Sequence, residues 1–173
     1  TDGLGGLINH LPGLTRGCHR TTGSHRGNDE RNLVATREEL AKMRALCIET
    51  ADRVMTRNKK KVTYTIGTMI ELPRAALLAD QIAQEADFFA FGTNDLTQTV
   101  FGLSRDDAGK FLPEYVEKKI LPQDPFVAID QEGVGLLMEI GIQKGRSTKP
   151  NLKMGICGEH GGEPSSVAFC RNL

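Results

Sequence analysis

From residue 33 onward, apolar and polar positions follow helical and strand periods in turn, which predicts a chain of alternating helices and strands. Thr36-Arg-Glu-Glu39 is a capping box, and apolar residues follow it at helical spacing up to Val54. Proline and glycine signals place further helices after Pro73 and Pro164 and over 131–144. Segments rich in β-branched and aromatic residues predict three strands, over 62–70, 87–92 and 152–157.

This order of elements indicates an α/β fold with a parallel sheet and crossover helices. Such sheets occur in open doubly wound folds and in closed (β/α)8 barrels. The first strand presents apolar residues on one face and small or polar residues on the other, which favours a crowded barrel interior. Eight strands close a barrel, whereas three are visible here, with the end of a fourth at "NLVAT" (32–36). We therefore predict a partial (β/α)8 TIM barrel with about half of its strands.

Residues 1–32 differ from the rest, because they follow neither a helical nor a strand period. They contain seven of the 19 glycines and three of the four histidines. We interpret 1–32 as an irregular, disordered tail of unknown origin and 33–173 as the partial barrel domain. Cys18 and His19, with His10 and His25, offer an alternative metal cluster, but their spacing matches no zinc pattern, so a solvated tail is preferred.

The balance of charge excludes two classes of partner. The chain has 22 basic and 22 acidic residues, so neither a nucleic acid nor a membrane surface is expected to bind it. No apolar run approaches the roughly 20 residues of a membrane span, and no apolar signal core supports secretion. The four cysteines form no C-x-x-C pair and are expected to be free thiols. We expect a cytoplasmic location, with an organelle as the alternative.

Carboxylates stand at the ends of two predicted strands. Glu71 ends the first strand, and Asp95 lies just beyond the second. Neighbouring parallel strands lie about 4.8 Å apart, so both carboxylates can reach one cation. Mg²⁺ suits such a site, because it binds one or two carboxylates together with substrate oxygens. The alternative is that each carboxylate caps the helix that follows it.

Two further features extend this candidate site. In "FGTNDLTQ" (91–98), Gly92 permits a close turn, Thr93 and Asn94 supply donors, and successive backbone N–H groups can bind anionic oxygens. Cys157 ends the third strand, where a thiol facing a cation is placed for proton transfer. A structural cysteine and a zinc pair with His160 are the alternatives, although no second pair of ligands follows. His160, Glu159 and Glu163 are candidates for tuning the pKa of the thiol, in a direction the sequence does not fix.

Three stretches carry a specific resemblance: "GTMIELPRAALLADQIA", "DFFAFGTNDLTQTVFGLSRDDAGKFLPEY" and "NLKMGICGEHGGEPSSVAF". They resemble the C-terminal barrel domain of the pyruvate, phosphate dikinase family, one of the phosphoenolpyruvate-utilising enzymes, from about Leu33 to Ala168. The resemblance implies that a phosphohistidine transfers a phosphoryl group to or from pyruvate with Mg²⁺. It implies that Glu71 and Asp95 hold Mg²⁺ and that Cys157 is the catalytic proton donor. The residues it implies for substrate binding are Glu71, Gly92, Thr93, Asn94 and Asp95.

The departures from the family define the competing hypotheses. The phosphohistidine domain, the nucleotide-binding domain and the first and last barrel strands have no counterpart in this sequence, and residues 1–32 match nothing in the family. We expect a fragment of a phosphotransferase whose full-length relatives are homo-oligomeric. A non-catalytic module that binds substrate and metal or pairs with another chain, and a remnant without function, are the alternatives. An open barrel edge also predicts association or aggregation.

Overall fold

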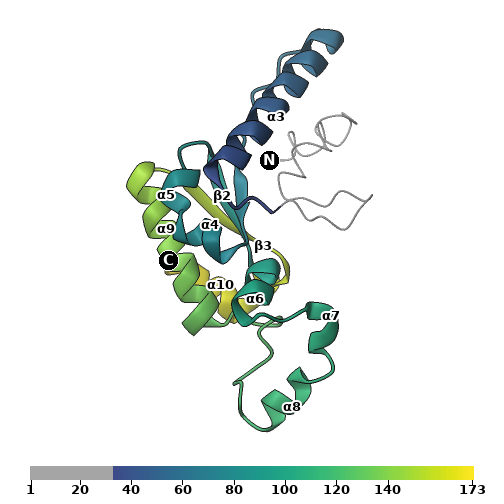
Figure 1. Ribbon diagram of the computed structural model, residues 1–173, viewed down its shortest axis with the longest axis vertical. Coiled ribbons are helices and arrows are strands. Elements are labelled where there is room, and N and C mark those ends of the chain that lie inside the picture. Colours follow the sequence, from purple (N-terminus) through teal and green to yellow (C-terminus); the bar gives the residue numbers. More distant parts are fainter. Residues whose placement is uncertain (1–32) are drawn as a thin grey trace.

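A small parallel sheet organises the computed structural model, which describes residues 33–173 (Figure 1). Its three strands are β1 (Thr68–Ile70), β2 (Phe88–Gly92) and β3 (Lys153–Cys157). They pair side by side in the order β1-β2-β3, and both pairs are parallel. The mixed α/β class and the crossover connections expected from the sequence are therefore confirmed.

Helices fill most of the chain between the strands. Before the sheet lies α3 (Arg37–Asn58), and β1 and β2 are linked by α4 (Pro73–Leu77) and α5 (Ala79–Ile82). The connection from β2 to β3 contains α6 (Thr93–Phe101), α7 (Arg105–Ala108), α8 (Leu112–Glu117), the π-helix η1 (Gln131–Gly135) and α9 (Leu136–Thr148). The 3-10 helix η2 (Glu159–Gly162) and α10 (Pro164–Arg171) follow β3.

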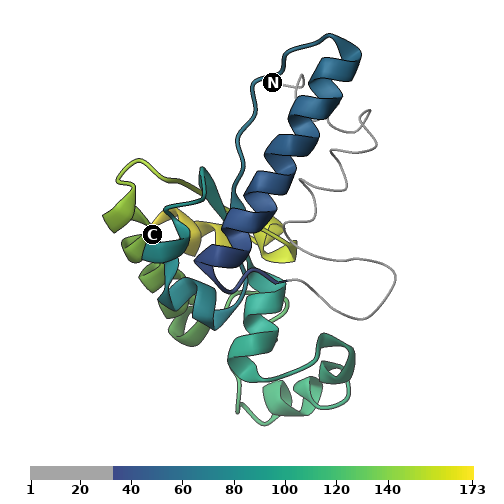
Figure 2. The ribbon, with the colours of Figure 1, turned by 45° about the horizontal axis from the view of Figure 1, so that its top comes forward.

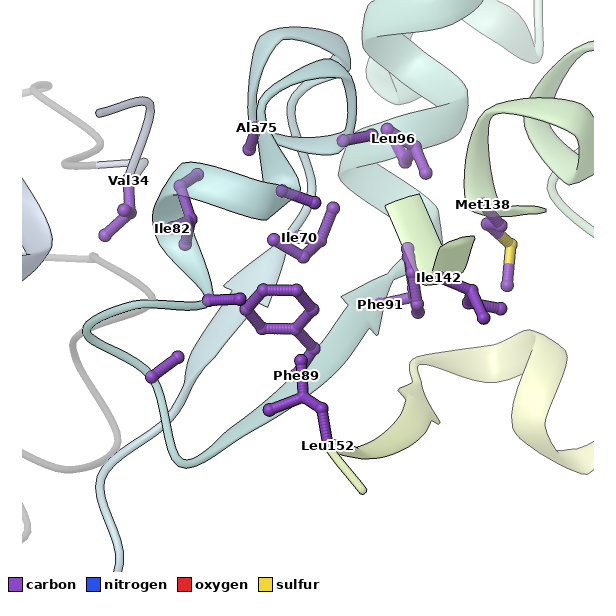
Figure 3. Packing of buried hydrophobic residues seen from close by; sticks show 14 of the residues in the cluster. Val34, Ile70, Ala75, Ile82, Phe89, Phe91, Leu96, Met138, Ile142 and Leu152 are labelled. Carbon is purple, nitrogen blue, oxygen red and sulfur yellow. The ribbon is translucent and has the colours of Figure 1, made fainter. Parts of the chain in front are cut away.

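The two faces of the sheet have different surroundings. Ile70, Phe89 and Phe91 share one face and are buried in the main hydrophobic core, beneath side chains of α4, α5 and α9 (Figure 3). The opposite face carries Met69 and Gly155, which are half-buried and exposed respectively. Because side chains alternate along a strand, Glu71, Gly92 and Cys157 belong to the same side as Met69 and Gly155. In β1 the predicted division into an apolar and a small or polar face is seen only in part, because Thr68 shares the core face with Ile70 and Met69 lies on the other face.

A long helix, α3, extends away from the sheet (Figures 1 and 2). Thr36 and Glu39 form the capping box predicted from the sequence. Cys47, on the same helix, is buried. Arg44 ties the helix to the sheet through two hydrogen bonds to the Asp87 carboxylate, at 3.1 and 3.2 Å, and one to the carbonyl of Ile66.

A helical insertion, defined here as residues 103–128, projects from the sheet at the end opposite α3 (Figure 1). It contains α7 and α8 and has a small apolar cluster of its own, centred on Ala108, Leu112 and Phe126. The sequence predicted no helix over these residues. Two helices of four and six residues are too short to display a clear apolar period, which explains why they escaped prediction.

Several predicted bounds were wrong, and the contacts give the reasons. The first strand covers 68–70, not 62–70, because Ile66 is bonded instead to Asp87 and Arg44. Residues 33–35 form no strand, since the backbone N–H of Ala35 donates to Glu39 and its carbonyl accepts from Arg74. The helix after Pro73 is broken at Leu78, and the one predicted to end near 145 continues to Thr148. The predicted tail, 1–32, and its Cys18 cluster lie outside the described residues.

Candidate active site

The carboxyl ends of three neighbouring strands bring the predicted site residues together. Ile70 is paired with Phe91, so Glu71 follows β1 beside Gly92. Gly92 is in turn paired with Cys157 at the end of β3. A carboxylate, a glycine and a thiol therefore form a row across the sheet edge, and Glu71 is only 2% exposed.

Gly92 provides space for Glu71. A Cβ atom at residue 92 would lie 2.7 Å from Oε2 of Glu71, 2.8 Å from its Cβ and 2.4 Å from the terminal methyl of Met69. These approaches are closer than packed atoms tolerate, so any side chain here would displace the carboxylate. The glycine predicted for a close backbone approach is confirmed as such, and the group that approaches it is Glu71.

The "TND" segment forms the first turn of a helix, whereas the sequence predicted an irregular turn. Thr93, Asn94 and Asp95 begin α6, and Gly92 is its N-cap. The backbone N–H groups of a helix start favour anionic oxygens, which is the property that the sequence predicted for the turn. Asp95 is the acidic residue in the first turn of α6, so the alternative role of a carboxylate at a helix start stays a prediction. Asp95 Oδ1 accepts a hydrogen bond from Gln98 at 3.1 Å.

Asn94 has a side-chain oxygen that lacks a hydrogen-bond partner within the described chain. Its Oδ1 atom is buried and has no hydrogen-bond partner among residues 33–173. Buried polar atoms normally have a partner, and leaving one unsatisfied costs about 1–3 kcal/mol. An oxygen-rich cluster with one unsatisfied acceptor fits a bound cation or a polar ligand.

Cys157 is held in a conformation that its neighbour makes possible. Gly158 has φ +102° and ψ −177°, a region open to glycine alone. The half-buried thiol donates to the carbonyl of Phe91 at 3.4 Å. Burial raises its pKa, and the negative charges of Glu71 and Asp95 raise it further. The thiol is therefore protonated at neutral pH, as a proton donor must be.

His160 has a role that the sequence did not reveal. It is completely buried; Nδ1 lies 2.7 Å from the Thr93 hydroxyl and Nε2 lies 3.0 Å from the carbonyl oxygen of Pro125. Both ring nitrogens are thus engaged, which argues against the zinc pair with Cys157. The Thr93 hydroxyl also lies 3.3 Å from the carbonyl oxygen of Cys157.

The other two residues considered as pKa partners of the thiol have structural roles instead. Glu159 forms an ion pair with Arg105 of the helical insertion at 2.5 Å. Glu163 caps α10 by accepting from the backbone N–H groups of Ser165 and Ser166. The pKa of Cys157 is set by burial and by carboxylates from the other two strand ends. Sequence proximity therefore gave the wrong candidates for this effect.

Glu71 and Asp95 are the candidate cation ligands, and both lie near enough to Cys157 for their charges to raise the pKa of its thiol. No group of three or more His, Cys, Asp or Glu side chains suited to a metal is found within residues 33–173. A site with fewer carboxylates matches Mg²⁺, which keeps several waters and substrate oxygens in its coordination shell. The donor set present on the strand ends therefore fits that ion better than it fits zinc.

The family model described as "PEP-utilising enzyme, PEP-binding domain" matches residues 32–173, so the chain belongs to this family. The chain is 59% identical over 137 residues to a chloroplastic pyruvate, phosphate dikinase of Mesembryanthemum crystallinum. It is 57% identical over 141 residues to the pyruvate, phosphate dikinase of Clostridium symbiosum.

The similarity covers most of this chain and a small part of each relative. The two alignments include 79% and 82% of the chain, but only 14% and 16% of the respective dikinases. A third dikinase, from Rhizobium meliloti (strain 1021), gives the same picture, with 58% identity over 80% of the chain and 15% of the relative. The resemblance stated from the three sequence motifs is confirmed. Separately, none of the helices within residues 33–173 has the length and apolar character of a membrane span.

Proposed function

We propose that this chain carries the phosphoenolpyruvate and pyruvate site of a phosphotransferase of the pyruvate, phosphate dikinase type. The observation that carries the proposal is the row of Glu71, Gly92 and Cys157 across three parallel strand ends, with the helix start of α6 beside it. Functional groups at the carboxyl ends of parallel strands are typical of (β/α)8 barrels, and the three strands are proposed to be part of one.

Glu71 and Asp95 are proposed to hold Mg²⁺. The bound ion would stabilise negative charge on the carboxylate and enolate oxygens of the substrate. The backbone at Gly92 and Thr93 and the first turn of α6 are proposed to orient the substrate oxygens, and the unsatisfied Oδ1 atom of Asn94 is proposed to contact a polar or cationic group there.

Cys157 is proposed to be the acid in the chemical step. When the phosphoryl group leaves phosphoenolpyruvate for a histidine, which becomes the phosphohistidine, the enolate of pyruvate remains. The S–H bond of Cys157 breaks, its proton forms a C–H bond at the methylene carbon, and the electron pair stays on sulfur as a thiolate. In reverse, the thiolate removes a methyl proton from pyruvate. The raised pKa of Cys157 keeps the thiol protonated until the enolate forms.

The complete reaction requires groups beyond the site described here. The phosphohistidine and nucleotide-binding domains are proposed to be supplied by other parts of a dikinase, assembled as a homo-oligomer in the cytoplasm or an organelle. The proton-transfer half-reaction needs neither of these domains. It is therefore the step by which the site can be tested in this chain.

The test is exchange of the methyl protons of pyruvate with D₂O, followed by NMR in the presence of Mg²⁺. Exchange is expected with the wild-type chain and should be lost in Cys157→Ala and on addition of EDTA. Cys170→Ala is the matched control, because Cys170 is a half-buried thiol on α10 away from the strand ends. Unchanged exchange in Cys157→Ala would refute the role of the thiol.

A binding module without turnover is the second candidate. The exposure of Lys153 and Gly155 on β3 favours this candidate. It means that one side of the sheet is only partly covered among the described residues. Folded chain that binds Mg²⁺ and pyruvate in calorimetry but gives no exchange would support this candidate over catalysis.

A further inference from the structure

We propose that His160 is a positioning residue that sets the placement of the Cys157 turn relative to the start of α6. This inference rests on the proposed function, because it assigns a role at the same site. His160 is 0% exposed and contacts segments far apart in the sequence, through Thr93 and Pro125. A single imidazole thus joins η2, the first turn of α6 and the helical insertion.

The chemistry of its two partners fixes the tautomer of the imidazole. A carbonyl oxygen only accepts, so Nε2 must carry the hydrogen that bonds Pro125. A neutral imidazole carries one ring hydrogen, so with Nε2 as the donor Nδ1 is the acceptor. The Thr93 hydroxyl is therefore the donor in the 2.7 Å contact.

The tautomer also determines which of the two contacts of the Thr93 hydroxyl is the main hydrogen bond. A hydroxyl has one proton, so Thr93 cannot make two full donor bonds. The contact to His160 is short, at 2.7 Å, whereas the contact to the Cys157 carbonyl is 3.3 Å. The longer contact is the minor branch of a three-centre hydrogen bond. His160 consequently sets the direction of the hydroxyl that lies between the helix start and the backbone of Cys157.

The helical insertion holds the same turn from a second side. Arg105 pairs with Glu159, immediately before His160, and its guanidinium lies 5.9 Å from the ring centroid of Phe126. Phe126 follows Pro125, whose carbonyl accepts from His160. The insertion therefore contacts η2 at two consecutive residues, Glu159 and His160. The buried residue, His160, is the more constrained of the two.

Two conservative substitutions separate the partners of His160. In His160→Asn the amide oxygen takes the place of Nδ1 and still accepts from Thr93. In His160→Gln the amide nitrogen takes the place of Nε2 and still donates to Pro125. Each variant keeps one of the two hydrogen bonds. A merely structural role therefore predicts that both variants lose a similar share of pyruvate exchange. Positioning through Thr93 predicts that pyruvate exchange falls about tenfold or more in His160→Gln and stays within about threefold of wild type in His160→Asn.

Two further measurements stay informative if the proposed function fails. Imidazole ¹⁵N NMR of the wild-type chain, with His160 assigned by its absence in His160→Asn, should show the Nε2–H tautomer; the Nδ1–H tautomer would overturn the proposal. Site-resolved alkylation should show Cys157 reacting at a different rate in His160→Gln from that in wild type or His160→Asn. Equal rates for Cys157 in the two variants would also overturn the proposal. Absence of exchange in the wild type alone refutes only the proposed function.

Discussion

The carboxylate of Glu71 occupies the space that a side chain on Gly92 would need, with Oε2 only 2.7 Å from the Cβ position. This relationship couples two residues of neighbouring strands at the centre of the candidate site. It also means that the position of the carboxylate depends on the absence of a single methyl group.

Gly92→Ala is therefore expected to destabilise the fold by about 1–3 kcal/mol through overpacking. It should also abolish pyruvate exchange, because the new methyl group displaces Glu71. Thermal melts and the exchange assay measure the two effects. Gly109→Ala is the matched control, since a Cβ there meets nothing within 4 Å and its φ is −58°. A Gly92→Ala protein as stable as wild type would contradict the packing described here.

Glu71→Gln is expected to lower the pKa of Cys157, because the Glu71 charge is one of the groups that raise it. Burial, the larger cause, remains, so the pKa should stay above its ordinary value. Below that pKa, alkylation of Cys157 should become about threefold to tenfold faster, as loss of one nearby like charge predicts. Mass spectrometry of the modified peptide measures this rate separately from that of Cys170.

Mg²⁺ should act in the same direction in the wild-type chain, by offsetting the charge of Glu71 and Asp95. The proposed ion would then accelerate alkylation of Cys157 in wild type and have little effect in Glu71→Gln. Glu159→Gln is the control, because Glu159 is near in sequence but is paired with Arg105. An equal response to Mg²⁺ in wild type and Glu71→Gln would exclude Glu71 as a ligand.

Glu163 is expected to make stability depend on pH in the acid range. Hydrogen bonds from Ser166 and Ser165 lower its pKa from 4.5 to about 2. A carboxyl whose pKa is depressed by folding contributes stability above its unfolded pKa, and this is lost as the pH falls from 4.5 towards about 2. Glu163→Gln should reduce the loss of stability with falling pH, as measured in melts recorded across that range. Glu117→Gln, an exposed substitution on α8, should leave the dependence unchanged.

Arg44→Lys is expected to destabilise the attachment of α3 to the sheet. The guanidinium bonds both oxygens of Asp87 and the carbonyl of Ile66, a geometry that a lysine cannot reproduce. We expect a loss of about 1–2 kcal/mol, since charge-assisted bonds are the strong ones. Denaturant unfolding measures it, with the exposed Arg53→Lys on the same helix as the control. Equal midpoints for the two variants would show that the Arg44 contacts contribute nothing.

Local sequence determined the elements whose signals are local. The capping box of Thr36 and Glu39 fixed the start of α3, and the proline at residue 73 fixed the start of α4. The apolar runs placed β2 and β3 within one residue of their bounds. Glu71, Gly92 and Cys157 could be predicted to lie together, because parallel strands bring their carboxyl ends to one edge.

Tertiary structure decided what depends on contacts between distant segments. The strand at 62–70 was shortened because the Asp87 carboxylate, 21 residues away from Ile66, bonds the backbone N–H of Ile66. His160 could not be distinguished from a zinc ligand until Thr93 and Pro125, 67 and 35 residues away, were found against its ring. The pKa of Cys157 likewise depends on Glu71 and Asp95, not on its sequence neighbours. Periodicity reports which face of an element is buried, whereas hydrogen bonds and charges act through space and require the folded arrangement.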